Sequence, residues 1–176
     1  MSRKARYFKV CIVGDFGVGK STLLHQYLER RFLSNVQSTI GSNFFVKHLK
    51  LPKSNHYITL QIWDLAGQDH FKWVRRAFYK GAKGVVYVFD LTRKESFTRI
   101  KQWKEEVEEI TGFIPNVLVG NKSDLNENKI ISVEDSVILK QDIDASSFHE
   151  TSAKLGTGVD DVFLKLSLEM NKKYIQ

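Results

Sequence analysis

The residues with the clearest chemical implication form a glycine-rich loop, Gly14–Ser21, directly after an apolar run. Its letters, GDFGVGKS, fit the pattern G-x-x-x-x-G-K-[ST]. Glycines let the backbone curl so that successive N–H groups point at phosphates, and a helix that starts near Lys20 adds its positive end. Lys20 can reach the terminal phosphates, and the Ser21 hydroxyl can bind Mg²⁺. Because the loop lies between a predicted strand and a predicted helix, a nucleoside triphosphate site is favoured over a chance glycine-rich turn, and the base stays open.

Two further polar segments follow predicted strands and could select the base. Asn121–Asp124 (Asn-Lys-Ser-Asp) follows residues 116–120, and Thr151–Lys154 (Thr-Ser-Ala-Lys) follows residues 147–150. The carboxyl ends of strands form the ligand-binding rim of an open α/β sheet, so we expect both segments there. The Asp124 carboxylate can accept hydrogen bonds from both N1–H and the exocyclic amine of guanine, and adenine offers no such pair of donors. The pattern therefore favours guanine, with an Asx turn as the alternative for Asn121–Asp124 alone.

Alternating strands and helices must position these segments. Short apolar runs predict strands at residues 8–13, 44–51, 57–63, 84–89, 116–120 and 147–150. Longer amphipathic stretches predict helices at residues 20–29, 71–79, 94–110, 133–141 and 159–172. Most of these strands are apolar throughout, which is typical of strands buried on both faces. The alternation predicts an α/β domain with a six-stranded, mostly parallel sheet flanked by about five helices.

The link between the second and third predicted strands is an exception. Residues 52–55 (Pro-Lys-Ser-Asn) are turn-like and leave no room for a helix, so these strands should form an antiparallel hairpin at one edge of the sheet. The 176 residues contain no internal repeat and no long linker. We therefore expect a single domain, residues 1–176, with a core of about 8–173.

Composition leaves some functions open and disfavours others. The net charge of +7 could suggest nucleic acid or an acidic membrane surface. The basic residues are scattered, as Arg3, Lys4 and Lys172 illustrate, so a solvated basic surface without nucleic acid is favoured. The single cysteine, Cys11, lies in an apolar run and should be a buried thiol rather than a nucleophile. Because there is no signal peptide and no stretch long enough to span a membrane, we expect a cytoplasmic protein.

Taken together and in this order, the motifs resemble the Ras superfamily of small GTPases from Phe8 to Met170. The matching segments are Gly14–Ser21, Thr39, Asp64–Gln68, Asn121–Asp124 and Thr151–Lys154. Within the superfamily the chain is most similar to the Rab branch, through Ser38–Gly41 with Phe44, Leu60–Asp64, Phe78–Ala82 and Tyr87–Thr92. The resemblance implies a P-loop GTPase domain. It also implies a molecular switch that binds GTP or GDP with Mg²⁺ and hydrolyses GTP slowly, in vesicle or membrane traffic if the Rab likeness extends to biology.

The resemblance also implies roles for individual residues. Thr39 would bind Mg²⁺ through its hydroxyl and the γ-phosphate through its backbone, the Gly67 N–H would contact the same phosphate, and Gln68 would orient the attacking water. The implied catalytic residues are Gln68, Lys20, Gly67 and Thr39, and the implied metal ligands are Ser21, Thr39 and Asp64. The implied nucleotide contacts are Asp15, Phe16, Gly17, Val18, Gly19, Lys20, Ser21, Thr22, Phe32, Thr39, Gly67, Asn121, Lys122, Asp124, Ser152, Ala153 and Lys154. For Phe32, an ordinary core aromatic is the alternative.

Phe16 departs from the Rab pattern, which has a small residue at this position of the loop. A phenyl ring there could obstruct an arginine finger or crowd Gln68, and the chain would then be a GTP- or GDP-binding interaction module with little or no hydrolysis. Alternatively, the ring lies outward and changes nothing. No arginine is evidently placed to act in cis. Arg75 and Arg76 come too late in the predicted helix 71–79 for such a role to be assigned, and they are expected on a solvated helix face. A partner would then have to supply the accelerating arginine.

Partners are expected at the switch regions. Phe44, Trp63 and Phe78 match the surface triad through which Rab proteins meet effectors, although Trp63 could equally belong to the core. Effectors, an exchange factor and an activating protein are the expected partners of a monomer. The chain ends without a cysteine that could be prenylated, so peripheral membrane attachment is expected only if a lipidated tail is missing. A P-loop ATPase or kinase is a further alternative, which Asn121–Asp124 and Ser152–Lys154 disfavour.

Overall fold

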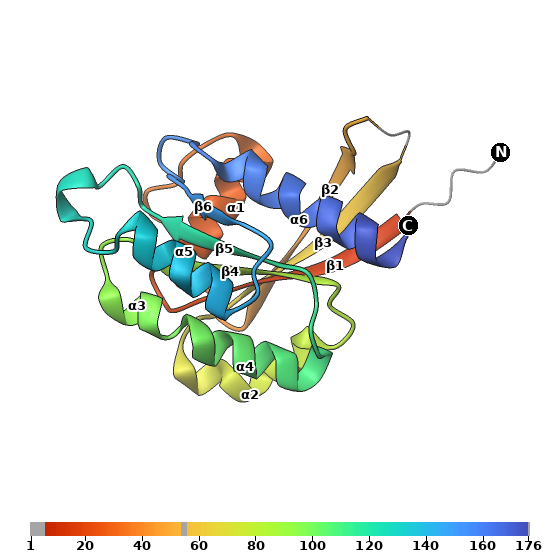
Figure 1. Cartoon of the computed structure of the whole chain (residues 1–176), viewed down its shortest axis with the longest axis horizontal. Coiled ribbons are helices and arrows are strands. Elements are labelled where there is room, and N and C mark those ends of the chain that lie inside the picture. The colour runs from red at the N-terminus through yellow and green to blue at the C-terminus, as the bar shows by residue number, and fades with distance from the viewer. Residues whose placement is uncertain (1–5, 54–55, 176) are drawn as a thin grey trace.

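A six-stranded sheet crosses the middle of the molecule in the computed structural model, which describes residues 6–53 and 56–175 (Figure 1). The strand order is β2-β3-β1-β4-β5-β6. The strands are β1 (Arg6–Val13), β2 (Ser42–Lys50), β3 (Tyr57–Leu65), β4 (Gly84–Asp90), β5 (Asn116–Asn121) and β6 (Phe148–Glu150). All neighbouring strands pair in parallel except β2 and β3, which are antiparallel with Phe44 opposite Trp63. The predicted sheet and its antiparallel edge are confirmed. The predicted turn at 52–55 lies partly outside the described residues.

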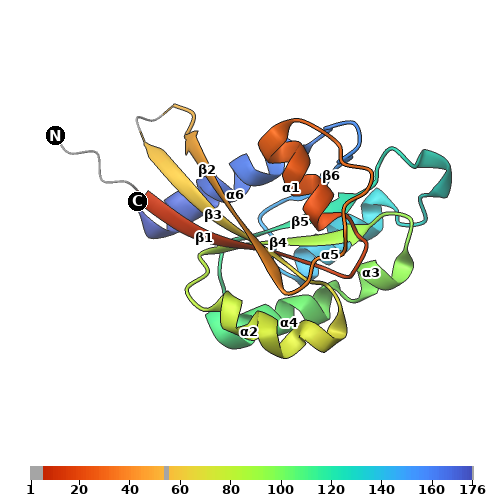
Figure 2. The same cartoon turned by 180° about the vertical axis from the view of Figure 1, so that it is seen from behind.

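Helices cover both faces of the sheet. They are α1 (Lys20–Glu29), α2 (Lys72–Tyr79), α3 (Lys94–Thr98), α4 (Ile100–Thr111), α5 (Val133–Asp142) and α6 (Val159–Tyr174). Short 3₁₀ turns are η1 (Asp69–Phe71) and η2 (Asn126–Asn128). Figures 1 and 2 show α1 and α6 on one face, and α2 and α4 on the other. The prediction of about five helices is confirmed, because α3 and α4 together occupy the predicted helix 94–110, which divides at Arg99.

Alternate residues of the central strands pack into two separate apolar cores. In β1, Val10 and Ile12 join the core beneath α1 and α6, whereas Cys11 and Val13 join the core beneath α2, α4 and α5. This arrangement explains why the strands read as continuous apolar runs, since neither face meets water. Cys11 is fully buried, as expected from the sequence. Among the described residues, no helix is both long and apolar enough to cross a membrane.

Candidate nucleotide-binding site

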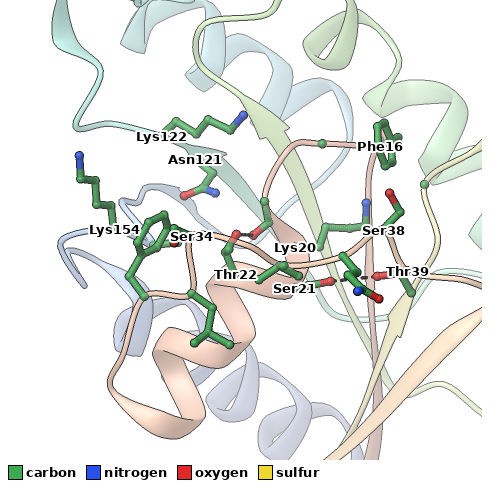
Figure 3. A pocket seen from close by; sticks show the side chains of 18 of the residues that line it. Phe16, Lys20, Ser21, Thr22, Ser34, Ser38, Thr39, Asn121, Lys122 and Lys154 are labelled. Atoms are coloured by element: carbon green, nitrogen blue, oxygen red, sulfur yellow. Dashed lines mark hydrogen bonds between the residues drawn. The ribbon is translucent and has the colours of Figure 1, made fainter.

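A cavity of about 460 Å³ opens at the carboxyl ends of the central strands (Figure 3). Its volume lies in the range of small-molecule sites. It is lined by Phe16, Gly17, Gly19, Lys20, Ser21, Thr22, Phe32, Leu33, Ser34, Val36, Gln37, Ser38, Thr39, Gly67, Asn121, Lys122, Asp124, Leu125, Ala153 and Lys154. In Figure 3, Asn121, Lys122 and Lys154 lie toward one end, and Lys20, Ser21 and Thr39 toward the other. Segments far apart in sequence therefore share one cavity, as the motif order predicts.

The glycine-rich loop between β1 and α1 has a backbone that a larger residue could not adopt. Gly19, at the start of α1, has a φ of 97°. A Cβ atom added there would lie 2.4 Å from Asn121 Nδ2. The Asn121 amide in turn donates to the Val18 carbonyl at 3.0 Å and accepts from Thr151 Oγ1 at 2.9 Å. Asn121 of β5 thus holds the loop in place, and it can do so only because Gly19 has no side chain.

Lys20 places a buried cation against this loop. Its ammonium donates to the Gly14 carbonyl at 2.7 Å and to the Asp15 carbonyl at 2.9 Å. Burial lowers the pKa of Lys20 from its ordinary value to about 8, although the Asp64 and Asp15 carboxylates oppose that shift. A cation held beside the backbone amides of a helix N-terminus suits the phosphates of a nucleotide.

Ser21, Thr39 and Asp64 converge from three separate segments. The Ser21 and Thr39 hydroxyl oxygens lie 3.0 Å apart, and Ser21 Oγ also donates to Asp64 Oδ2. Asp64 is fully buried, and its other oxygen, Oδ1, has no hydrogen-bond partner among the described residues. Burial raises the pKa of Asp64, although the hydrogen bond from Ser21, the charge of Lys20 and the neighbouring Asn43 side chain oppose that shift. One carboxylate with an unsatisfied oxygen and two hydroxyls form a set of hard oxygen donors that fits Mg²⁺.

The base-selecting segments are held to one another at the other end of the cavity. Asp124 accepts a hydrogen bond from Ser152 Oγ at 2.7 Å. Lys122 has a left-handed backbone with a φ of 68°, and its ammonium lies 2.7 Å from the Asp90 carboxylate. The hydrogen bond from Ser152 therefore gives the Asp124 carboxylate a fixed orientation at the edge of the cavity.

Three of the expected nucleotide contacts do not line the cavity. Val18 is buried in the core, and Ser152 is buried behind Asp124. The Asp15 side chain turns away, where its Oδ1 accepts from Trp103 Nε1 at 2.8 Å. Since the loop motif does not distinguish a side-chain contact from a backbone contact, the sequence could not separate these residues from the others.

Two aromatic side chains flank the cavity. Phe16 lines it with 51% of its surface exposed, and the Phe16 carbonyl accepts from Arg93 Nη2 at 2.6 Å. Phe32 also lines it and is 42% exposed, so the alternative of a core aromatic does not hold. Both rings are therefore free to contact a ligand.

Gly67 and Gln68 begin the segment that leaves β3 toward α2. A Cβ atom added at Gly67 would lie 2.4 Å from the Phe16 backbone nitrogen and 2.5 Å from the Gly14 carbonyl oxygen. The two backbones therefore touch. The Gln68 side chain is not among the lining groups of the cavity, and its Oε1 is buried without a hydrogen-bond partner among the described residues. Among the described residues, the Gln68 side chain therefore lies outside the cavity with its amide oxygen unpaired.

The expectation that Arg75 lies on a solvated helix face is wrong. Arg75 is 1% exposed and forms a buried ion pair with Glu106 of α4, whereas its neighbour Arg76 lies near the surface and pairs with Glu109. The sequence did hold one signal. Glu106 falls three residues after Trp103 on the buried stripe of α4, where a carboxylate requires a partner.

The aromatic triad lies together on the outer part of the sheet. The ring centroids are 4.8 Å apart for Phe44 and Trp63, and 5.1 Å apart for Trp63 and Phe78. Phe44 is 47% exposed, and the other two rings are half-buried. Trp63 therefore serves the core and the surface at once.

Comparison with known proteins agrees with this geometry. Residues 9–172 match the family model of the Ras family. Among similar proteins are the Ras-related protein RIC1 of Oryza sativa subsp. japonica, at 39% identity, and the Ras-related protein RABD2a of Arabidopsis thaliana, at 38%. The GTP-binding protein YPTM2 of Zea mays is 37% identical. Each of these matches covers 94% of this chain and 81% of the relative. The chain therefore belongs to the Ras family as a Rab-type small GTPase, a molecular switch that binds GTP and GDP and hydrolyses GTP.

Proposed function

We propose that Ser21, Thr39 and Asp64 hold the Mg²⁺ of the bound nucleotide, and that Thr39 and Gly67 make the switch respond to the γ-phosphate. The buried, unpartnered Oδ1 of Asp64 beside two hydroxyls is the observation that carries this proposal. Bound Mg²⁺ would neutralise charge on the β- and γ-phosphates. Lys20, which lines the cavity, would add a second positive charge from the protein side, and the amides of the loop and of Gly67 would donate to the phosphate oxygens.

Gln68 is proposed to orient the attacking water through its amide oxygen, which no described residue occupies. No arginine among the described residues lines the cavity: Arg75 is held by Glu106, and Arg93 donates to the Phe16 carbonyl. Of the lysines that line the cavity, Lys20 lies toward the end with Ser21 and Thr39, whereas Lys122 and Lys154 lie toward the other end (Figure 3). Intrinsic hydrolysis should be slow and should accelerate when an activating protein supplies an arginine.

A second candidate, a nucleotide-binding module with little hydrolysis, is favoured by the position of Phe16. Its ring lines the cavity, and its backbone nitrogen is adjacent to Gly67. Single-turnover GTP hydrolysis should be compared for the wild type and Phe16→Ser, with and without an activating protein. A faster Phe16→Ser variant supports the second candidate, and equal rates in both conditions contradict it.

The proposed effector surface is the triad of Phe44, Trp63 and Phe78, which extends from the switch segments onto β2, β3 and α2. A partly exposed cluster of aromatic rings in contact is typical of protein-binding sites. The Rab-type relatives support a role in vesicle traffic, with GTP-dependent recruitment of effectors to a membrane. A monomer without nucleic-acid binding, found in the cytoplasm or peripherally on a membrane, completes the proposal.

The metal proposal is tested by the dissociation of a fluorescent GDP analogue with Mg²⁺ and after addition of EDTA. For the wild type, chelation should accelerate release. In Ser21→Ala, release with Mg²⁺ should already be faster by roughly tenfold and should respond less to EDTA. Thr111→Ala is the control, because Thr111 Oγ1 donates to the Val107 carbonyl of its own helix α4 and Thr111 does not line the cavity. Release that is independent of Mg²⁺ in the wild type would contradict the proposal.

A further inference from the structure

A buried ion pair joins the switch helix α2 to α4. Arg75 Nε lies 2.9 Å from Glu106 Oε1, and Arg75 Nη2 lies 3.1 Å from Glu106 Oε2, so the two groups meet in a bidentate arrangement. The side chains are 2% and 7% exposed. Tyr79 also donates to Glu106 Oε1 at 2.7 Å. Because a buried charge is expensive unless its partners are complete, this network fixes the guanidinium in one orientation.

The remaining nitrogen of Arg75 holds the segment that carries Gln68. Arg75 Nη1 donates to the Ala66 carbonyl at 2.9 Å and to the Gln68 carbonyl at 2.7 Å. These two carbonyls flank Gly67, whose backbone touches the glycine-rich loop. One guanidinium therefore sets the course of three consecutive residues on the edge of the nucleotide site.

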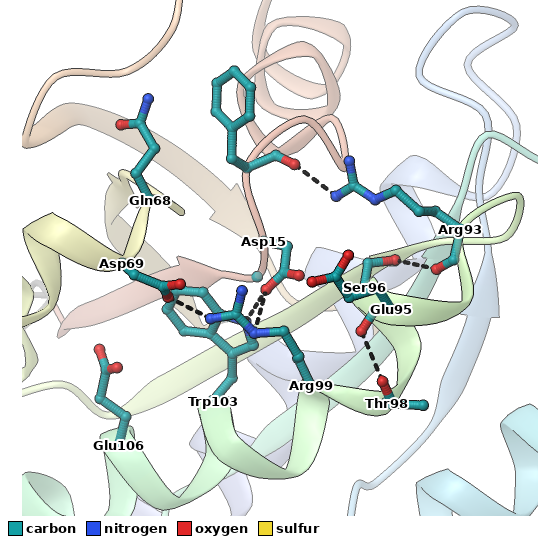
Figure 4. A network of polar contacts seen from close by, with 12 residues as sticks. Asp15, Gln68, Asp69, Arg93, Glu95, Ser96, Thr98, Arg99, Trp103 and Glu106 are labelled. Atoms are coloured by element: carbon teal, nitrogen blue, oxygen red, sulfur yellow. Dashed lines mark hydrogen bonds and ion pairs between the residues drawn. The ribbon is translucent and has the colours of Figure 1, made fainter.

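The Arg75 guanidinium is also connected to the glycine-rich loop, through Trp103. Its carbon lies 4.4 Å from the centroid of the Trp103 ring, and Trp103 Nε1 donates to Asp15 Oδ1 at 2.8 Å. Figure 4 shows Trp103 of α4 and Arg99, the residue before α4, reaching Asp15, with Arg99 also contacting Asp69, the residue after Gln68. The backbone of Gln68 and the phosphate loop thus share one support.

A second ion pair between α2 and α4 shows what attachment of the two helices alone requires. Arg76 and Glu109 join the same two helices by a surface ion pair at 2.5 Å. Among the described residues, Arg76 makes no hydrogen bond to a backbone carbonyl, whereas Arg75 makes two. If attachment were the only role, the pairing of Arg75 with Glu106 would suffice without the two carbonyl contacts.

We propose that Arg75 is a positioning residue for GTP hydrolysis, which holds the Ala66–Gln68 backbone so that the Gln68 side chain meets the attacking water. The inference rests on the proposed role of Gln68. Lysine could not replace Arg75, because a single ammonium cannot reach both Glu106 oxygens and both carbonyls with a fixed planar geometry. GDP lacks the γ-phosphate that Gly67 is proposed to contact, so GDP binding should not need Arg75.

The test is a double-mutant cycle in single-turnover GTP hydrolysis, with Arg75→Lys, Gln68→Ala and the combination. Affinity for a fluorescent GDP analogue and the melting temperature are measured for each variant. Arg75→Lys should hydrolyse GTP roughly 10- to 100-fold more slowly, the range expected when a reacting group is misplaced by a small distance, with GDP affinity unchanged. In the Gln68→Ala background the same substitution should have no further effect. Arg76→Lys, the matched control, should behave as the wild type.

Each other outcome is decisive. If Gln68→Ala is slow but Arg75→Lys hydrolyses normally, or if the two losses multiply, Arg75 does not act through Gln68 and the inference is overturned. If Gln68→Ala itself hydrolyses at the wild-type rate, the proposed role of Gln68 fails first, and the inference falls with it. If Arg75→Lys does not fold, Glu106→Gln takes its place in the same double-mutant cycle. A reduction of the hydrolysis rate that disappears in the Gln68→Ala background supports the inference, and a reduction that multiplies with that of Gln68→Ala contradicts it.

Discussion

Gly67→Ala probes the contact between the segment that leaves β3, residues 66–68, and the glycine-rich loop Gly14–Ser21. The added Cβ would lie 2.4 Å from the Phe16 nitrogen, 2.5 Å from the Asp15 carbonyl carbon and 2.5 Å from the Gly14 oxygen. All three are backbone atoms and cannot rotate away. Ordinary contact begins near 3.4 Å, so the separation from the Phe16 nitrogen has to grow from 2.4 Å by about 1 Å. The switch segment, which follows the end of β3, should yield rather than the loop.

A displacement of this size moves the Gly67 amide and Gln68 away from the γ-phosphate position. Since misplacement by about 1 Å can reduce a rate by about 100-fold, single-turnover GTP hydrolysis should fall by that order. GDP affinity should change little, because the base-selecting segments are untouched. Gly81→Ala serves as the control: nothing lies within 4 Å of its added Cβ, although its φ of 76° carries a left-handed strain of about 1 kcal/mol. Wild-type hydrolysis by Gly67→Ala would refute the reasoning.

Three further predictions concern other parts of the chain. Asn121→Ala removes the bonds to Val18 and Thr151 and should destabilise the protein by about 1–3 kcal/mol while weakening GDP binding, as measured by denaturant unfolding and fluorescence titration; unchanged values would contradict the assigned role. Burial raises the pKa of Cys11 to about 12, so a thiol reagent at pH 8 should label it only after unfolding, and rapid labelling of the folded protein would contradict its burial. Phe44→Ala should reduce GTP-dependent capture of an effector and leave GDP affinity intact; undiminished capture would remove the triad from the interface.

The sheet was predictable because its signals are local. Neighbouring residues of the central strands, such as Val10 and Cys11, belong to the two different cores. Because both faces of these strands are buried, their residues are apolar throughout, which is visible in the sequence. The antiparallel edge followed from the short link after β2. The division of the predicted helix 94–110 at Arg99 could not be predicted. The stretch on both sides has helical periodicity, and Arg99 itself keeps a helical backbone.

The site was predictable where its motifs are contiguous and unpredictable where contacts are tertiary. The glycines and the lysine of the loop Gly14–Ser21 are by themselves enough to predict a phosphate site. The burial of Arg75 depends on Glu106, which is 31 positions away, and on the Trp103 ring beneath it. Similarly, the Asp15 side chain belongs to the support of the loop rather than to the cavity because α4 supplies its partner. Pairings of this kind are set by the packing of helices and leave little trace in spacing.

The central claim is that the segments around Thr39 and Gly67 respond to the γ-phosphate. Hydrogen exchange should be compared between the Mg²⁺ complexes of GDP and of a non-hydrolysable GTP analogue. Residues 36–41 and 66–71 should exchange more slowly in the GTP-analogue complex, because Thr39 and Gly67 lie at the cavity and gain contacts there. Residues 121–124 and 151–154, which are expected to hold the base in both states, should exchange equally. Identical exchange of residues 36–41 and 66–71 in the two complexes would contradict the account.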